Sequence, residues 1–118
     1  MKVFVIEDNP VYNDYVCNLL KKDSFDTMSA YNLATAKKLL VKSEVDDIVV
    51  ADLRLPDGES IELLRWMRAN DKQQVFIVMT NYGEVHTAVE SMKLGSKDYI
   101  QKQLLERSEE HTSELQSH

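Results

Sequence analysis

The feature that most limits the possible folds of this chain is a short apolar run that ends in a carboxylate, Ile48-Val49-Val50-Ala51-Asp52. Four apolar or small residues in a row, β-branched in the middle, are typical of a strand buried on both faces, as in a parallel sheet. A carboxylate that closes such a strand lies at its carboxyl end, which is the edge where open α/β sheets bind ligands. Asp52 is therefore the first candidate for a functional residue, although an Asp that begins a solvated loop would give the same pattern.

The rest of the chain alternates between strand-like and helix-like segments. The strand-like runs cover residues 3–6, 25–30, 48–52, 75–79 and 98–100. Apolar residues recur at helical spacing after each of them, over 10–22, 33–42, 61–67, 84–93 and from 104 onward. Right-handed crossovers between parallel strands place helices on both faces of the sheet. We therefore predict a doubly wound α/β fold with a five-stranded parallel sheet.

Composition and charge indicate a single ordinary domain. The 118 residues suffice for one core, and no apolar run approaches the ~18 residues needed to span a membrane. The net charge of −6 argues against direct binding to nucleic acid, because phosphate contacts need a basic surface. The single cysteine, Cys17, cannot form an internal disulfide, and the first residues do not resemble a signal peptide. We expect a cytoplasmic location and no membrane partner.

Polar side chains stand at the ends of four predicted strands. Glu7 and Asp8 follow the first strand and Asp52 closes the third, while Thr80 and Lys102 follow the fourth and fifth. Three carboxylates gathered at one edge repel each other unless a divalent cation or an ammonium group offsets their charge. Mg²⁺ prefers such oxygen ligands and also bridges to phosphate. Lys102 would neutralise part of the cluster, and the Thr80 hydroxyl could donate to a phosphoryl oxygen.

Over residues 1 to about 106 the chain resembles the receiver domain of the response regulators of two-component signalling. Four segments carry the resemblance, in order and at the family's spacing: the acidic pair at 7–8, and residues 49–58, 79–83 and 95–102. The segment 79–95 is similar to receivers of NtrC-type enhancer-binding transcription activators. The resemblance implies the flavodoxin-like strand order 2-1-3-4-5.

The resemblance also implies a role for each candidate residue. Asp52 would be the phosphoacceptor, Thr80 and Lys102 would bind the phosphoryl group, and Thr80 with Tyr99 would form the conformational switch. The implied cofactor is Mg²⁺, held by Glu7, Asp8, Asp52 and the backbone carbonyl of Arg54. The implied donor is a sensor histidine kinase, which passes a phosphoryl group from phosphohistidine to the carboxylate.

The expected function is therefore a phosphorylation-controlled switch for an output domain. We expect that output domain to be transcriptional and to be missing from this chain. A phosphorylation-dependent homodimer is a further expectation. We expect self-phosphotransfer and slow autodephosphorylation, not enzymatic turnover.

Three alternatives use the same fold. A phosphohydrolase that forms an aspartyl phosphate usually has a second Asp two positions later, where this chain has Arg54. A flavin module would need a phosphate cradle in place of the acidic loop at 7–10. A non-phosphorylated interaction module is the third.

The end of the chain differs in character from the rest. Residues 107–118 contain one large apolar residue, Leu115, and no helical periodicity. Their sequence resembles the in-frame translation of a sequencing-library adapter. We therefore expect a receiver domain over 1–106, with a truncated fifth helix, and a non-native tail over 107–118.

Overall fold

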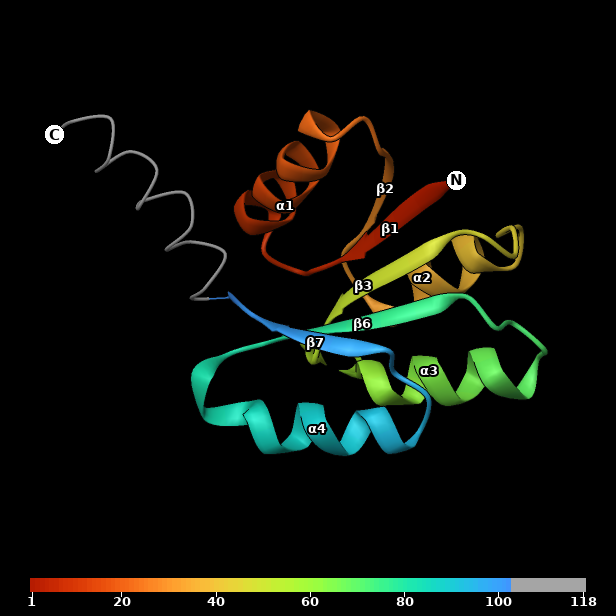
Figure 1. The fold of residues 1–118 in the computed structure, drawn as a ribbon, viewed down its shortest axis with the longest axis vertical. Helices are drawn as coiled ribbons and strands as arrows, with labels where there is room; N and C mark the ends of the chain where they lie inside the picture. Colours follow the sequence, from red (N-terminus) through yellow and green to blue (C-terminus); the bar gives the residue numbers. More distant parts are fainter. Residues whose placement is uncertain (103–118) are drawn as a thin grey trace, which may run out of the picture.

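The computed structural model describes residues 1–102, apart from the side chain of Tyr82, and shows the predicted sheet at its centre. The five strands are parallel and lie in the order β2-β1-β3-β6-β7. Their bounds are β1 Lys2–Ile6, β2 Asp26–Ala30, β3 Ile48–Asp52, β6 Val75–Thr80 and β7 Asp98–Gln101. Counted as five, this is the order 2-1-3-4-5, so the predicted fold class and topology are confirmed (Figure 1).

Four α-helices connect the strands. Their bounds are α1 Pro10–Lys22, α2 Leu33–Leu40, α3 Ser60–Ala69 and α4 Val85–Lys93. Asn9 caps α1 by accepting from the amides of Val11 and Tyr12, and Asn32 caps α2 by accepting from the amide of Thr35. These side chains satisfy amide groups that the first turn of a helix leaves without an intrahelical partner. The helices therefore begin where the sequence supplies a capping residue.

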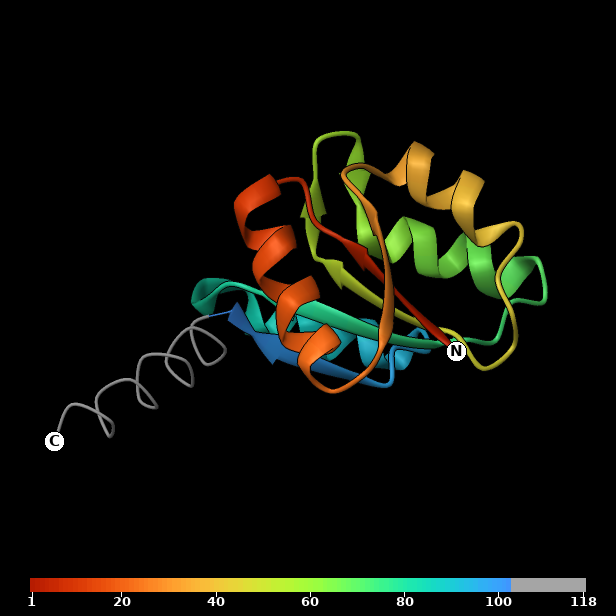
Figure 2. The same cartoon turned by 90° about the horizontal axis from the view of Figure 1, so that it is seen from above.

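The sheet separates two apolar cores, because successive side chains of a strand point to opposite faces. Val3 and Val5 of β1 pack with Val16 and Cys17 of α1 on one face. Phe4 and Ile6 of the same strand pack on the opposite face, against residues of α2, α3 and α4. Figures 1 and 2 show this arrangement, with α1 on its own side of the sheet. Cys17 is a free and buried cysteine within this core.

The segment after β3 contains a short hairpin that the sequence patterns do not indicate. β4 (Arg54–Leu55) and β5 (Gly58–Glu59) form a short antiparallel hairpin before α3. Gly58 has a φ angle of +143°, a backbone conformation that residues with a Cβ atom rarely adopt. The carboxylate of Asp57 at the hairpin tip accepts hydrogen bonds from the amides of Leu33 at 2.8 Å and Ala34 at 3.1 Å. The hairpin therefore holds the start of α2.

Several element boundaries differ from the predictions by one or two residues. β2 begins at Asp26, one residue late, and α2 ends at Leu40 instead of residue 42. A 3₁₀ turn, η1 (Tyr82–Glu84), precedes α4, which begins at Val85. Helix ends often continue as 3₁₀ turns, which periodicity does not reveal. The predicted start of a fifth helix and the predicted tail over 107–118 lie outside the described residues.

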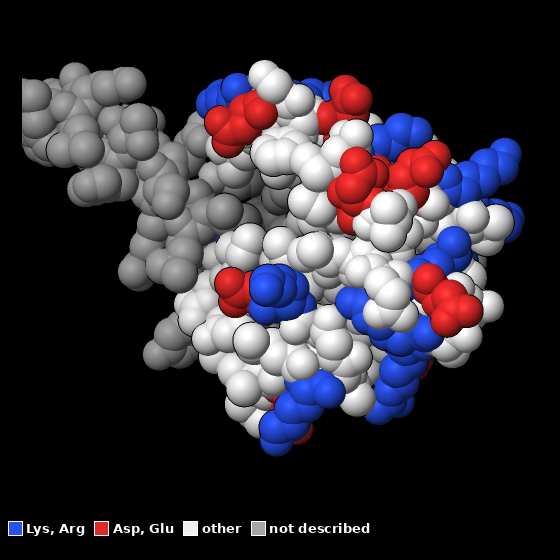
Figure 3. Space-filling view, turned by 45° about the vertical axis from the view of Figure 1, so that its right-hand side comes forward, with Lys and Arg blue, Asp and Glu red and all other residues white. Residues whose placement is uncertain are grey.

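Charged side chains of both signs are interspersed on the face shown in Figure 3. The net charge of −6 is therefore not gathered into one continuous acidic surface on that face. Among residues 1–102, no helix combines the length and the apolar character that a membrane crossing requires.

Candidate functional site

The candidate site lies at the carboxyl edge of the sheet, where the central strands β1 and β3 end side by side. Ile6 is paired with Ala51, so the next residues along each strand, Glu7 and Asp52, reach the same edge. The backbone amide of Glu7 donates to the carbonyl of Ala30 at 3.0 Å, which extends the pairing between β1 and β2 by one residue. The sheet itself therefore fixes the positions of the two carboxylates.

Three carboxylates meet at this edge. Glu7, Asp8 and Asp52 each offer an oxygen atom, and these atoms lie within 4.8 Å of one another. Glu7 and Asp52 are buried, with 1% and 7% of their surfaces exposed, whereas Asp8 is exposed. The cluster thus has two buried members and one that faces solvent, which leaves it open on the side of Asp8.

Lys102, the residue after β7, reaches across the sheet edge into this cluster. Its Nζ atom lies 2.5 Å from Oε1 of Glu7 and 3.1 Å from Oδ2 of Asp52. The same ammonium group lies 4.8 Å from the centroid of the Tyr12 ring, and the Tyr12 hydroxyl donates to the Lys102 carbonyl at 3.4 Å. Lys102 therefore bridges the two buried carboxylates and is itself held by α1.

Burial and pairing act in opposite directions on the acids of the site. Burial raises the pKa of the Asp52 carboxyl above its ordinary value, against the opposing effect of the nearby Lys102 charge. Burial likewise raises the pKa of Glu7, which is partly offset by its hydrogen bond from Lys102. Burial alone would lower the pKa of Lys102, but the bond to Glu7 and the charge of Asp52 raise it overall. The lysine therefore stays charged, and a desolvated carboxylate is kept beside a fixed cation.

A buried amide in α1 supports the acidic loop, and the sequence analysis missed it. Asn13 is 0% exposed, and its Nδ2 lies 3.3 Å from the carbonyl of Val5, 3.1 Å from that of Glu7 and 3.5 Å from that of Ala30. Its Oδ1 accepts from the Ser29 hydroxyl at 2.6 Å. Asn13 therefore ties α1 to the carboxyl ends of β1 and β2. An Asn among the apolar positions of an amphipathic helix was the signal that could have identified it.

A second missed contact crosses the rim of the site. The Arg54 guanidinium forms an ion pair with Glu84 of η1 and another, at 3.2 Å, with Glu59 of β5. These hydrogen bonds raise the pKa of Arg54, with Glu84 contributing most. The side chain of Arg54 is largely exposed, so the ion pair lies at the surface. It joins the loop after β3 to the loop after β6.

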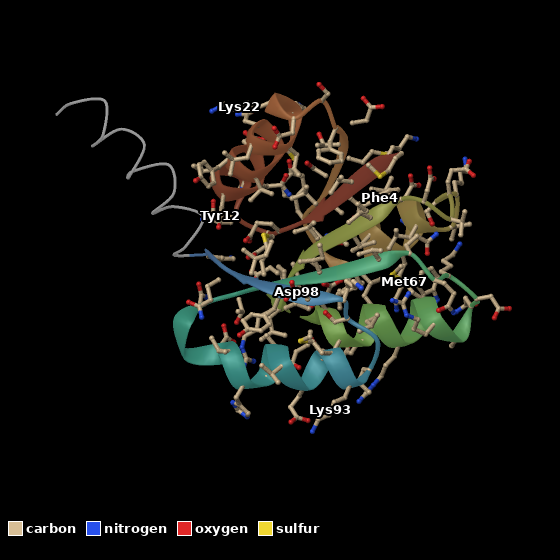
Figure 4. The ribbon with its side chains drawn as sticks, viewed as in Figure 1. Phe4, Tyr12, Lys22, Met67, Lys93 and Asp98 are labelled. Carbon is tan, nitrogen blue, oxygen red and sulfur yellow. The ribbon has the colours of Figure 1, made fainter. Side chains whose placement is uncertain are left out.

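The two predicted switch residues, Thr80 and Tyr99, lie on the neighbouring strands β6 and β7. Thr80 ends β6, one residue beyond the Met79 that pairs with Asp52, and is fully buried. Its hydroxyl donates to the carbonyl of Asn81 at 3.1 Å. Tyr99 is half-buried on β7 and packs against the core shared with α2, α3 and α4. Figure 4 shows β7 beside β6, with Asp98, the neighbour of Tyr99, labelled.

The donor set fits a hard divalent cation. Its side-chain ligands are carboxylate oxygens, with no nitrogen or sulfur donor in the group, and such oxygens suit Mg²⁺. Lys102 places one positive charge beside Glu7 and Asp52, which partly compensates the negative charge of the three carboxylates. The exposed Asp8 leaves a side from which a hydrated ion can approach.

A parallel sheet of this strand order, with an acidic cluster and a lysine at its carboxyl edge, defines a receiver-like α/β domain. Residues 3–112 match the family model described as the response regulator receiver domain, so the chain belongs to that family. The predicted resemblance is confirmed.

Relatives among known proteins agree with this assignment. The chain is 31% identical to the response regulator protein PilR of Pseudomonas aeruginosa over 101 residues, which cover 86% of this chain and 22% of PilR. It is similar to the crystal structure of full-length FixJ from B. japonicum, with a TM-score of 0.77 and 33% identity over 86% of this chain and 49% of that one. The receiver domain of NtrX from Brucella abortus has the same fold, with a TM-score of 0.79, 20% identity and coverage of 93% and 96%. The chain thus spans about one fifth of PilR and half of FixJ.

Proposed function

We propose that the domain accepts a phosphoryl group on Asp52 and passes the signal to an output domain. The observation that carries the proposal is the desolvated Asp52 carboxylate, 3.1 Å from the Lys102 ammonium and within 4.8 Å of two further acids. A carboxylate oxygen of Asp52 attacks the phosphorus of a phosphohistidine, an O–P bond forms, and the P–N bond breaks with its electron pair on the imidazole. Lys102 offsets negative charge on the transferred group.

Glu7, Asp8, Asp52 and the backbone carbonyl of Arg54 are the proposed ligands of Mg²⁺. When bound, this ion would offset the charge of the phosphoryl oxygens. Glu7 is held for this role by its contacts with Lys102 and with the amide of Asn9, which donates to Oε2 at 3.1 Å. Asn13 holds the backbone carbonyl of the same residue. Neighbouring residues thus hold both the carboxylate and the backbone carbonyl of Glu7 in place.

Thr80 and Tyr99 are the proposed switch. The Thr80 hydroxyl donates to the carbonyl of Asn81, and rotation toward a phosphoryl oxygen would exchange that bond for a charge-assisted one. The ring of Tyr99 could then move into the space beside β6, which would alter the surface of α4 and β7. A difference of a few kcal/mol between the two states suffices for such a switch.

The proposed partners are a sensor histidine kinase as donor and a transcriptional output domain as recipient. Support comes from the names of the relatives, which include the response regulator protein PilR and the transcriptional regulatory protein FixJ of Bradyrhizobium diazoefficiens. A homodimer that forms on phosphorylation is a further part of the proposal, as is a cytoplasmic location. We propose no direct contact of this domain with nucleic acid, and no catalysis beyond its own phosphorylation and dephosphorylation.

Labelling with acetyl phosphate tests the central step. We expect Asp52→Asn to abolish Mg²⁺-dependent labelling, detected by intact-protein mass spectrometry, because an amide oxygen is a much weaker nucleophile than a carboxylate. Asp46→Asn is the matched control, since Asp46 is an exposed acid outside the site. Undiminished labelling of the Asp52 variant would rule out the assignment, and loss of labelling in both variants would point to a general defect.

A further inference from the structure

A second concave site lies away from the acidic cluster, between α2 and the first two strands. This groove has a volume of about 310 Å³ and is lined by Lys2, Phe4, Met28, Lys38, Leu39 and Lys42. Lys2 begins β1, whereas Glu7 follows its last residue, so the length of the strand separates the groove from the candidate phosphorylation site. Figure 4 shows Phe4, which lines the groove, and Tyr12, which contacts Lys102, toward opposite ends of the sheet.

The floor of the groove is apolar and well supported. Phe4 on β1 and Met28 on β2 are register partners, so their side chains lie next to each other on one face of the sheet. Phe4 is 3% exposed and belongs to the core, and both Met28 and Leu39 are partly buried against it. A floor held in this way keeps its shape when a ligand binds, which lowers the entropy cost of binding.

The rim of the groove carries three lysines. Lys2, Lys38 and Lys42 are exposed, and within residues 1–102 their ammonium groups form no ion pair or hydrogen bond. The neighbouring Lys37 differs, because its ammonium lies 5.9 Å from the centroid of the Trp66 ring. The three rim lysines are therefore available to an incoming anion.

Several acidic residues lie near this end of the sheet, but none of them lines the groove, whose charged lining residues are the three lysines. Asp47 is buried, and its carboxylate accepts hydrogen bonds from the backbone amides of Lys2 at 2.8 Å and Glu44 at 2.7 Å. Asp26 is the register partner of Lys2 and is exposed, but the two form no ion pair. The rim thus keeps a net positive charge on a chain whose total charge is −6.

We propose that this groove binds an acidic segment of a partner protein, with one apolar side chain against the floor and flanking carboxylates on the three lysines. The volume of about 310 Å³ lies at the lower end of small-ligand pockets, which suits insertion of a single large side chain. An anionic membrane is the less favourable occupant, since a flat surface does not enter a concave groove and would repel a chain of net charge −6. The charge complementarity defines the partner's chemistry.

A fluorescein-labelled pentapeptide, with a leucine between two Glu-Asp pairs, is the probe, and its binding is measured by fluorescence anisotropy. We expect K38E/K42E to weaken its binding at least tenfold, because attraction becomes repulsion at two of the three rim positions. K21E/K22E is the matched control, since these exposed lysines form a similar pair at the end of α1 and should leave binding unchanged. Binding should also weaken as salt is raised.

Methionine-methyl NMR tests the location without relying on substitutions. We expect the peptide to shift the Met28 methyl signal and to leave that of Met67, fully buried in the core, in place. No binding of the peptide, an equal loss in both double variants, or an unmoved Met28 signal would overturn the proposal. Retention by phosphatidylglycerol vesicles without peptide binding would overturn it in favour of a lipid surface. Labelling of Asp52 by acetyl phosphate should persist in K38E/K42E, so failure here is separable from failure of the phosphoacceptor assignment.

Discussion

Replacing Lys102 by methionine removes the cation that bridges the two buried carboxylates of the site. In the native chain its Nζ atom lies 2.5 Å from Glu7 and 3.1 Å from Asp52. Methionine has a similar length and fills similar space, so the variant changes charge more than packing. Both carboxylates would then lie at the sheet edge without a positive partner, next to Asp8.

The expected cost is about 3 kcal/mol of unfolding free energy, the lower end of the ~3–5 kcal/mol measured when one partner of a buried ion pair is removed. The lower end applies because the side chains of Lys102 and Asp52 keep 14% and 10% of their surface exposed, so water can reach the pair. With a urea m-value of about 1.5 kcal/mol/M, this corresponds to a midpoint shift of about 2 M.

The pH dependence provides a second signature of the same effect. Burial already raises the pKa values of Glu7 and Asp52, and loss of the lysine raises them further. A carboxyl group with a raised pKa binds more protons in the folded state, so its contribution to stability grows as pH falls. The stability deficit of the variant should therefore narrow as pH falls from 8 toward 5.

Urea unfolding in EDTA at several pH values is the assay, with Lys97→Met as the control because Lys97 is exposed and lies outside the acidic site. Mg²⁺ should restore part of the lost stability, since a cation again offsets the carboxylates. Equal stability of the Lys102 variant and the native chain at pH 8 without Mg²⁺ would refute the reasoning. So would a deficit that widens as pH falls.

Three further variants test other parts of the structure. Asn13→Ala should lower unfolding free energy by ~2 kcal/mol and weaken Mg²⁺ binding measured by calorimetry, because three carbonyls lose a buried donor, whereas the exposed Asn18→Ala should change neither. Asp57→Ala should cost ~1 kcal/mol in urea unfolding at pH 7. Hydrogen bonds from the α2 amides lower the pKa of Asp57 below its ordinary 3.8, so its contribution holds above that pH and disappears as pH falls below it. Gly58→Ala should lower the thermal midpoint, because its φ is +143° and a Cβ would lie 2.7 Å from Oε2 of Glu62. An unchanged unfolding curve would contradict the prediction for Asn13→Ala or Asp57→Ala, and an unchanged thermal midpoint would contradict the prediction for Gly58→Ala.

The sequence predicted the sheet well because its signals are local and strong. The apolar runs at 3–6, 48–52 and 75–79 became β1, β3 and β6, and even the weak run at 98–100 became β7. The hairpin of β4 and β5 was not predicted, since two-residue strands have no detectable periodicity. Its cap on α2 joins residues 24 positions apart, which no local pattern can indicate.

For the candidate site too, the sequence predicted which residues gather, whereas only the structure showed their contacts. The acidic cluster of Glu7, Asp8 and Asp52 was predicted correctly as a group, because strand ends in a parallel sheet share one edge. The sequence also placed Lys102 there, but only the structure showed that its ammonium bridges both buried acids. The roles assigned to Thr80 and Tyr99 stay predictions, since they concern a phosphorylated state.

What the sequence determined by itself is the order of elements, the strand-end residues and the chemistry they can perform, because these depend on periodicity and residue type along short segments. What only the tertiary structure decided is which distant groups touch. Asn13 meets the carbonyls of two strands, and Arg54 meets Glu84 thirty residues later. Lysines from β1, from α2 and from the turn after α2 surround one apolar floor. Such contacts depend on how helices pack across a twisted sheet, and that geometry is set by the whole core at once.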